Sequence, residues 1–123
     1  MKKIIALLVL LLSLTACGKQ EVNDNKDLLS VIKERGTLIV ATEGDWSPYT
    51  YHDEETNELV GFDVELGKMI ANKLGVKVEY KETDWDSILA GVQSGSFDLG
   101  INGITYSEER AQSFNFSTPY LYD

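Results

Sequence analysis

The stretch TLIVAT at residues 37–42 decides the fold class of this chain. Its unbroken run of apolar and β-branched residues is typical of a buried strand. Turn-forming residues border it on both sides, with Gly36 before it and the polar loop EGDWSP at residues 43–48 after it. A buried strand needs neighbouring strands and covering helices, and we expect the flanking segments to supply them.

Helices and strands alternate along the chain around this strand. Asp27, Asp84 and Ser107 each stand before a segment of helical character and are predicted to cap helices. The predicted elements are a helix over 28–35, a hairpin of residues 49–52 and 58–60, a helix over 63–74, a strand over 76–81, a helix over 85–94, a strand over 97–101, a helical turn over 107–112 and a short strand over 114–116. Because strands joined by crossover helices pair in parallel, this order predicts an α/β fold with a mainly parallel sheet flanked by helices.

The N-terminal part of the sequence differs from the rest. Two lysines precede an apolar run over residues 4–14 that is too short to span a bilayer comfortably. The sequence LTAC then places two small residues before Cys17, the only cysteine. We predict a lipoprotein signal peptide over residues 1–16, a lipid on Cys17 that anchors the chain to the membrane, and a flexible tether over residues 17–26. A plain secretory signal is the alternative.

The composition excludes several classes of function. The 123 residues carry a formal net charge of −9. Nucleic-acid phosphates require Lys and Arg partners, so we expect no nucleic-acid binding. The only histidine is His52 and the only cysteine belongs to the signal, so no Ser–His pair, Cys–His pair or zinc-ligand cluster can be assembled convincingly. We therefore expect no enzyme activity, no metal and no cofactor.

Polar groups follow two of the predicted strands and suggest a binding site. In an α/β sheet, ligands bind beyond the carboxyl ends of the strands, so the segments after residues 42 and 101 are expected to border one crevice. Arg110 is the strongest candidate, because a guanidinium matches a carboxylate with two parallel hydrogen bonds. Gly103 allows close approach of the backbone, and Thr105 offers an N–H and a hydroxyl. The competing interpretation makes Arg110 a surface helix residue paired with Glu109 or another acid.

Two aromatic residues and one acid complete the candidate site. Trp46 and Phe62 could form walls against a ligand side chain, and the alternative for both is packing in the core. Glu43 could face an ammonium or another polar group of the ligand, and is otherwise a surface acid. Asp63 follows Phe62 at the start of a predicted helix, so we expect it to act as the N-cap.

Five short motifs run in order between residues 38 and 120. They are LIVAT with PY (38–42 and 48–49), GFDVEL (61–66), WD through QSG to FD (85–98), GIT through ER (103–110) and FSTPY (116–120). With this order and spacing, the chain resembles the family-3 extracellular solute-binding proteins of bacteria, the class that binds polar amino acids. Motifs shared with cystine binders and with glutamine or general polar binders leave the particular amino acid open.

The resemblance implies a lobe of the type II periplasmic-binding-protein fold. Family members have two lobes that close on the ligand about a hinge, and residues 27–123 would form the first lobe, truncated before the hinge and the second. The resemblance also implies roles for the candidate residues. Arg110 grips the ligand α-carboxylate, Gly103 and Thr105 assist it, and the pocket for the ligand side chain is bordered by Trp46, Phe62 and Glu43.

The function implied is capture of an amino acid on the outer side of the cytoplasmic membrane. The chain would sit on the periplasmic side or cell surface, held by its lipid, and deliver the ligand to the permease of an ABC importer. Because half of the cleft supplies half of the contacts, we expect weak or undetectable binding by this chain alone. Two alternatives are a dehydratase that acts on prephenate-like acids and the ligand-sensing domain of a receptor.

Overall fold

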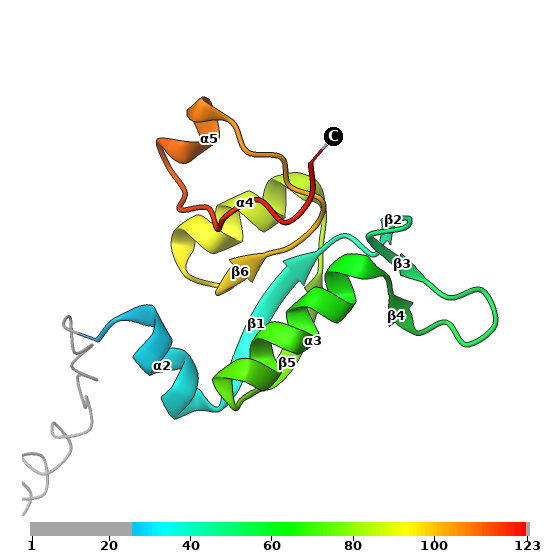
Figure 1. The fold of residues 1–123 in the computed structure, drawn as a ribbon, viewed down its shortest axis with the longest axis horizontal. Coiled ribbons are helices and arrows are strands. Elements are labelled where there is room, and N and C mark those ends of the chain that lie inside the picture. The colour runs from blue at the N-terminus through cyan, green and yellow to red at the C-terminus, as the bar shows by residue number, and fades with distance from the viewer. Residues whose placement is uncertain (1–25, 123) are drawn as a thin grey trace, which may run out of the picture.

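A three-stranded parallel sheet lies at the centre of residues 26–122, the part of the chain that the computed structural model describes (Figure 1). The middle strand is β1 (Thr37–Thr42), with β5 (Lys77–Glu82) on one side and β6 (Leu99–Gly100) on the other. All three strands run in the same direction. The predicted buried strand is therefore the centre of the sheet, and the mainly parallel order is confirmed.

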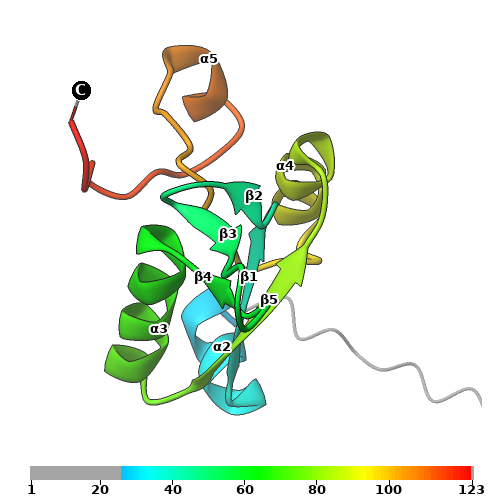
Figure 2. The same ribbon diagram turned by 90° about the vertical axis from the view of Figure 1, so that its right-hand side faces the viewer.

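Residues 26–122 form four helices, of which the first three flank this sheet (Figure 2). They are α2 (Leu28–Arg35), α3 (Phe62–Leu74), α4 (Trp85–Ser94) and the single turn α5 (Glu108–Ala111). Figure 2, in which the sheet is seen nearly edge-on, shows α2 and α3 on one face and α4 on the other. Alternate residues of β1 explain this arrangement, since Leu38 and Val40 pack in one buried cluster with Ile32 of α2 and Ala71 of α3.

The helix ends follow the predicted chemistry closely. The side chain of Asp27 accepts a hydrogen bond from Ser30 N, and that of Asp84 accepts one from Ser87 N, both at 3.0 Å. Ser107 accepts one from Arg110 N and caps α5. These three predicted caps are confirmed.

A small antiparallel sheet extends from the carboxyl end of β1. It contains β2 (Asp45–Trp46), β3 (Thr50–His52) and β4 (Leu59–Val60), in that order. The predicted hairpin is confirmed as β3 and β4. The prediction of a plain loop after β1 is wrong, because the backbone of residues 45–46 pairs with β3 and forms β2.

Two strand predictions near the C-terminus need correction. The strand expected over 97–101 is reduced to β6, since Phe97 turns beneath α4, where a β-carbon on Gly91 would lie 2.2 Å from its ring. The segment 114–116 forms no strand, and Phe116 instead packs edge-on against Tyr106.

Opposite ends of the parallel sheet are held by different polar groups. At the amino end, the buried carboxylate of Asp98 accepts hydrogen bonds from the Arg35 guanidinium and, at 2.7 Å, from Ile39 N. At the carboxyl end, Thr42 Oγ1 lies 2.8 Å from Thr50 Oγ1 and 2.9 Å from Asn102 Oδ1. The second group joins β1, β3 and the loop after β6, and so fixes the base of the region where a ligand is expected.

Within the described residues, no helix has the length and apolar character needed to cross a membrane. The predicted signal peptide, Cys17 and the tether up to residue 25 lie outside the described part of the chain.

Candidate functional site

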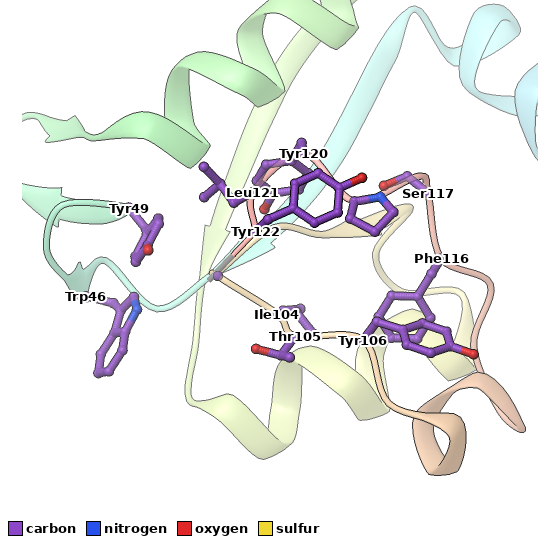
Figure 3. A pocket seen from close by; sticks show the side chains of 12 residues that line it. Trp46, Tyr49, Ile104, Thr105, Tyr106, Phe116, Ser117, Tyr120, Leu121 and Tyr122 are labelled. Atoms are coloured by element: carbon purple, nitrogen blue, oxygen red, sulfur yellow. The ribbon is translucent and has the colours of Figure 1, made fainter.

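A cavity of about 480 Å³ lies beyond the carboxyl ends of β1 and β6 (Figure 3). Trp46 stands on one side of it, and Tyr106 with Phe116 on the opposite side. The segments after β1 and β6, predicted to border one crevice, both contribute to it. Its complete lining is Trp46, Tyr49, Gly103, Ile104, Thr105, Tyr106, Phe116, Ser117, Pro119, Tyr120, Leu121 and Tyr122.

The six residues predicted to bind a ligand fall into two groups around this cavity. Those that line it are Trp46, Gly103 and Thr105. Those that contact a lining residue or its neighbour are Arg110, Phe62 and Glu43. The loop 103–105 is therefore the centre of the candidate site.

Gly103 occupies a confined position in this loop. Its φ of 60° lies in the left-handed region that glycine adopts without strain. A β-carbon there would lie 3.3 Å from Trp46 Nε1 and 3.5 Å from Tyr49 Cδ2. The N–H of Gly103 donates to Asp63 Oδ2 at 2.6 Å, which leaves its carbonyl as the group available to a ligand.

Asp63 does not cap α3, contrary to the sequence prediction. Gly61 takes the N-cap position, and Asp63 lies inside the first turn with 1% of its surface exposed. Its Oδ1 accepts a hydrogen bond from the Tyr120 hydroxyl at 3.1 Å. Burial raises the pKa of Asp63 above its ordinary value, and the hydrogen bonds from Gly103 and Tyr120 offset part of this rise.

Arg110 is oriented by neutral groups. Its Nη1 donates to the Thr105 carbonyl at 2.7 Å, and its guanidinium carbon lies 5.2 Å from the centroid of the Trp85 ring. Within residues 26–122, no carboxylate lies within salt-bridge distance of it, so the alternative pairing with Glu109 does not occur in this structure. The guanidinium keeps donors available beside the loop 103–105.

The two candidate aromatic residues are not core residues. Trp46 is 55% exposed and Phe62 is 48% exposed, so the alternative of core packing is wrong for both. The Phe62 ring stacks on Tyr120, with centroids 6.0 Å apart. Through this contact Phe62 supports one wall of the cavity without lining it.

Glu43 is fixed in place by Asn102. The Asn102 side chain donates to Glu43 Oε2 at 2.6 Å and accepts from Glu43 N at 2.9 Å. Asn102 is itself buried and directly precedes Gly103. The Glu43 carboxylate is thus held near the loop, although it does not line the cavity.

Sequence reasoning missed five aromatic residues of the lining, namely Tyr49, Tyr106, Phe116, Tyr120 and Tyr122. Tyr49 and Tyr120 each follow a proline, within motifs that carried the family resemblance without an assigned role. Those two Pro-Tyr pairs were the available signal. Tyr106 and Phe116 had none, because their contact joins segments that are not paired in any sheet.

Among the described residues, no group of three or more His, Cys, Asp or Glu side chains is arranged to hold a metal ion. The charged groups near the cavity are single residues with separate roles: Asp63 on the loop backbone, Arg110 on the Thr105 carbonyl and Glu43 on Asn102. Together with the aromatic side chains of the lining, these polar groups suit recognition of a small polar molecule.

Comparison with known proteins gives consistent relatives. The L-cystine-binding protein TcyA of Bacillus subtilis is 41% identical over 129 residues, which cover 98% of this chain and 48% of TcyA. The unliganded L-cystine solute receptor of Neisseria gonorrhoeae is 47% identical, with a TM-score of 0.69 over 77% of this chain and 40% of that one. The chain thus spans half or less of the length of these relatives.

A single-domain structure is also similar. The arginine-bound form of domain 1 from TmArgBP, as a Phe57Trp mutant, is 38% identical with a TM-score of 0.73, over 76% of this chain and 71% of that one. These neighbours confirm the predicted fold, a solute-binding-protein lobe with a parallel sheet flanked by helices.

One relative has a name of a different kind. The cyclohexadienyl dehydratase of Pseudomonas aeruginosa is 35% identical over 112 residues, which cover 91% of this chain and 41% of the enzyme. The more similar relatives are named as binding proteins. Residues 38–123 match the pattern of one family, and the chain belongs to it: the bacterial extracellular solute-binding proteins, family 3.

Proposed function

We propose that this chain captures an amino acid outside the cytoplasmic membrane and delivers it to the permease of an ABC importer, with the ligand α-carboxylate bound by Arg110. The observation that carries the proposal is the state of Arg110. Its guanidinium is oriented by the Thr105 carbonyl and the Trp85 ring, and no described carboxylate neutralises it. Such a cation beside an open cavity offers two parallel hydrogen bonds to a carboxylate.

The surrounding groups suit the other parts of an amino acid. The Gly103 carbonyl accepts no hydrogen bond from the described residues, so it can accept one from the ligand α-ammonium. The Thr105 hydroxyl and N–H supplement the Arg110 grip on the carboxylate. Trp46 and the Tyr120–Phe62 stack provide apolar walls for the ligand side chain, with Glu43 nearby for a polar or cationic group.

The similarity to lobes of known binding proteins supports residues 27–123 as a first lobe. The cystine-binding relatives favour L-cystine as the first ligand to test, with L-arginine second. A relative's domain 1 is described in an arginine-bound form, which supports a test on this chain by itself. Because a second lobe normally buries the rest of the ligand, we expect affinity about a thousandfold weaker than in a closed two-lobed protein.

Calorimetric titration of the chain with carboxylate-matched pairs tests the proposal. L-cystine is compared with cystamine, which lacks both carboxylates of cystine, and L-arginine with agmatine, which lacks the one carboxylate of arginine. We expect the amino acid of the preferred pair to bind at least about tenfold more tightly than its amine. Equal affinity of both members would overturn the carboxylate assignment.

A variant tests Arg110 directly. Arg110→Ala should weaken binding by about tenfold to a hundredfold, because a charge-assisted pair of hydrogen bonds is lost. Lys33→Ala is the matched control, since Lys33 is an exposed basic residue of α2 far from the cavity lining. Unchanged affinity of Arg110→Ala would place the carboxylate elsewhere.

We propose that the chain is a binding protein and not an enzyme. The similarity to a dehydratase makes this testable. Among residues 26–122, no Asp, Glu, His, Cys or Lys lines the cavity to serve as general acid or base. Incubation with prephenate, followed by chromatography, should leave the substrate at its uncatalysed rate of loss. Faster loss would favour the enzymatic alternative.

We propose further that a lipid on Cys17 anchors the chain on the outer side of the membrane. The support is the sequence itself, with two lysines, an apolar run and LTAC before the remainder of the chain. Metabolic labelling with a radioactive fatty acid should label the wild type and not Cys17→Ser. Equal labelling of both would contradict the anchor.

A further inference from the structure

Asp63 connects three segments that are far apart in the sequence. It is the second residue of α3, and its two carboxylate oxygens contact different partners. Oδ2 accepts from Gly103 N at 2.6 Å, and Oδ1 accepts from the Tyr120 hydroxyl at 3.1 Å. The partners lie 40 and 57 residues further along the chain. Both belong to the lining of the cavity.

The start of α3 does not depend on this carboxylate. Gly61 is the N-cap and has no side chain, and the first N–H groups of the helix donate to backbone carbonyls instead. Phe62 N donates to Pro48 O at 3.0 Å, and Asp63 N donates to Tyr49 O at 2.9 Å. The carboxylate of Asp63 is therefore free of the capping role, and both of its hydrogen-bond donors belong to residues that line the cavity.

Burial of the Asp63 carboxylate costs free energy, and the packing of α3 by itself does not explain why a carboxylate stands there. Only 1% of the residue is exposed, and its hydrogen-bond donors are the neutral Gly103 amide and Tyr120 hydroxyl. Among the described residues, no Lys, Arg or His forms an ion pair with it. The positive end of α3 offsets part of the cost, and the two hydrogen bonds offset more.

The hydrogen bond to Gly103 fixes the peptide plane between Asn102 and Gly103. This is the first peptide of the loop 103–105, and its direction sets where Thr105 presents its hydroxyl and its carbonyl. The Thr105 carbonyl in turn accepts from Arg110 Nη1 at 2.7 Å. A continuous series of contacts thus runs from Asp63 through the loop to the candidate carboxylate-binding guanidinium.

We infer that Asp63 is a positioning residue of the binding site, which holds the Gly103–Thr105 loop and the Tyr120 wall in their ligand-receiving arrangement without touching the ligand. The inference rests on the proposed amino-acid binding for its effect on affinity. The effect of Asp63 on the loop is independent of any ligand, so the inference about Asp63 and the proposed function can fail separately.

Three variants separate the contacts. Asp63→Ala removes both acceptors. Asp63→Asn keeps an acceptor for Gly103 N–H, and its amide can donate to the Tyr120 oxygen, so both contacts survive in altered form. Tyr120→Phe removes only the contact at Oδ1. Each variant is checked by circular dichroism, and each is compared with the wild type by amide hydrogen exchange and calorimetric titration with L-cystine and L-arginine.

In ligand-free protein, we expect the Gly103 amide of Asp63→Ala to exchange at least about tenfold faster than in the wild type. The Ile101 amide, which donates to Ala41 O at 3.1 Å in the sheet, is the internal reference and should be unchanged. Equal acceleration at both amides, or none at Gly103, would overturn the inference. This measurement decides the loop's dependence on Asp63 even where no tested amino acid binds the wild type.

With ligand, we expect Asp63→Ala to lose at least about tenfold in affinity and Asp63→Asn to stay within about threefold of the wild type, with Tyr120→Phe between them. Rescue by asparagine separates positioning from a need for charge at this site. Wild-type affinity in Asp63→Ala would overturn the inference. If the alanine variant does not fold, the Gly103 amide proton resonance of Asp63→Asn decides, because an amide acceptor in place of a carboxylate must shift it, and an unshifted resonance would overturn the inference.

Discussion

The two ends of the parallel sheet each hold one buried aspartate, in opposite electrostatic surroundings. At the amino end, the Asp98 carboxylate accepts hydrogen bonds from the Arg35 guanidinium and the Ile39 amide. At the carboxyl end, the Asp63 carboxylate accepts hydrogen bonds from the Gly103 amide and the Tyr120 hydroxyl, and it forms no ion pair among the described residues. Both carboxylates join elements that are distant in sequence. Only the first is neutralised by a cation.

This difference corresponds to the different surroundings of the two ends of the sheet. The amino end joins α2, β1 and β6, and a compensated charge there contributes only to holding the fold. The carboxyl end borders the cavity, where a salt bridge to Asp63 would bring a second cation into the site. Neutral donors connect the loop to α3 and leave Arg110 as the cation available to a ligand. The following predictions test this contrast, beginning with the largest effect.

Removing the cation from the amino end should produce the largest loss of stability. Arg35→Ala leaves the Asp98 carboxylate, 4% exposed, with only the Ile39 amide. Because Arg35 is itself 35% exposed, we expect a loss of about 2–3 kcal/mol rather than the full cost of breaking a buried pair. Urea denaturation measures it. Lys26→Ala, which breaks an exposed pair with Glu34, is the control and should cost at most about 0.5 kcal/mol.

Matched asparagine substitutions should separate the two aspartates. Asp98→Asn weakens a charge-assisted contact with Arg35, and we expect a loss of about 1–2 kcal/mol near neutral pH. Asp63→Asn removes a buried charge, but the asparagine side chain can still form hydrogen bonds with Gly103 N–H and with Tyr120. We therefore expect the free energy of unfolding to change by less than about 0.5 kcal/mol. Equal losses in the two urea transitions would show that the ends of the sheet do not differ.

The pH dependence of stability should reveal Asp63. Because burial raises the pKa of Asp63 in the folded state, the folded chain binds this proton more tightly than the unfolded chain does. Its contribution is therefore fully present below the ordinary value of 3.8 and is lost as the pH rises through the raised pKa. Relative to Asp63→Asn, the wild type should lose stability as the pH rises from below 3.8 through the raised pKa of Asp63. A constant difference between the two proteins as the pH rises from below 3.8 to neutral would contradict the raised pKa.

The smallest predicted effect concerns the exposed pair beside the small sheet. Both ring nitrogens of His52 face oxygen acceptors, Asn57 O and Glu82 Oε2, each at 2.9 Å. The Asn57 carbonyl and, second, Glu82 raise the pKa of His52 above 6.5. The stability from this pair is present below 6.5 and lost as the pH rises through the raised value.

Titration of the His52 ring by NMR tests this pair. Glu82→Gln should lower the pKa of His52 without bringing it below 6.5, because the Asn57 carbonyl remains. Glu79→Gln is the control on the same strand, since Glu79 pairs with Lys81. A shift as large in the control as in Glu82→Gln would assign the effect to net charge.

The parts of the fold that sequence reasoning predicted correctly depend on local chemistry. Asp27, Asp84 and Ser107 bond to N–H groups three residues away, so their spacing alone identifies them as caps. Strand β1 was readable from its apolar run. The prediction that Asp63 caps α3 failed, because a carboxylate at the start of a helix has the same local sequence pattern whether it caps the helix or bonds to a distant loop.

The candidate site was only partly predictable for a related reason. Trp46 lies after β1, and Gly103 and Thr105 lie after β6, so the rule that ligands bind beyond the carboxyl ends of parallel strands selects them. Tyr106 and Phe116 form a wall through a contact between two irregular segments, and no periodicity or motif encodes such a pairing. Short antiparallel pairing in β2 was equally hidden, since two residues carry no measurable pattern.

The contact between Arg110 and the Thr105 carbonyl has a consequence for how such a site can diversify. A backbone carbonyl is present whatever side chain stands at position 105, so the anchor of the guanidinium does not depend on the identity of that residue. Replacement of Thr105 can alter the surface that a ligand meets while the arginine stays oriented. The orientation of the Arg110 guanidinium therefore places no constraint on which side chain stands at position 105.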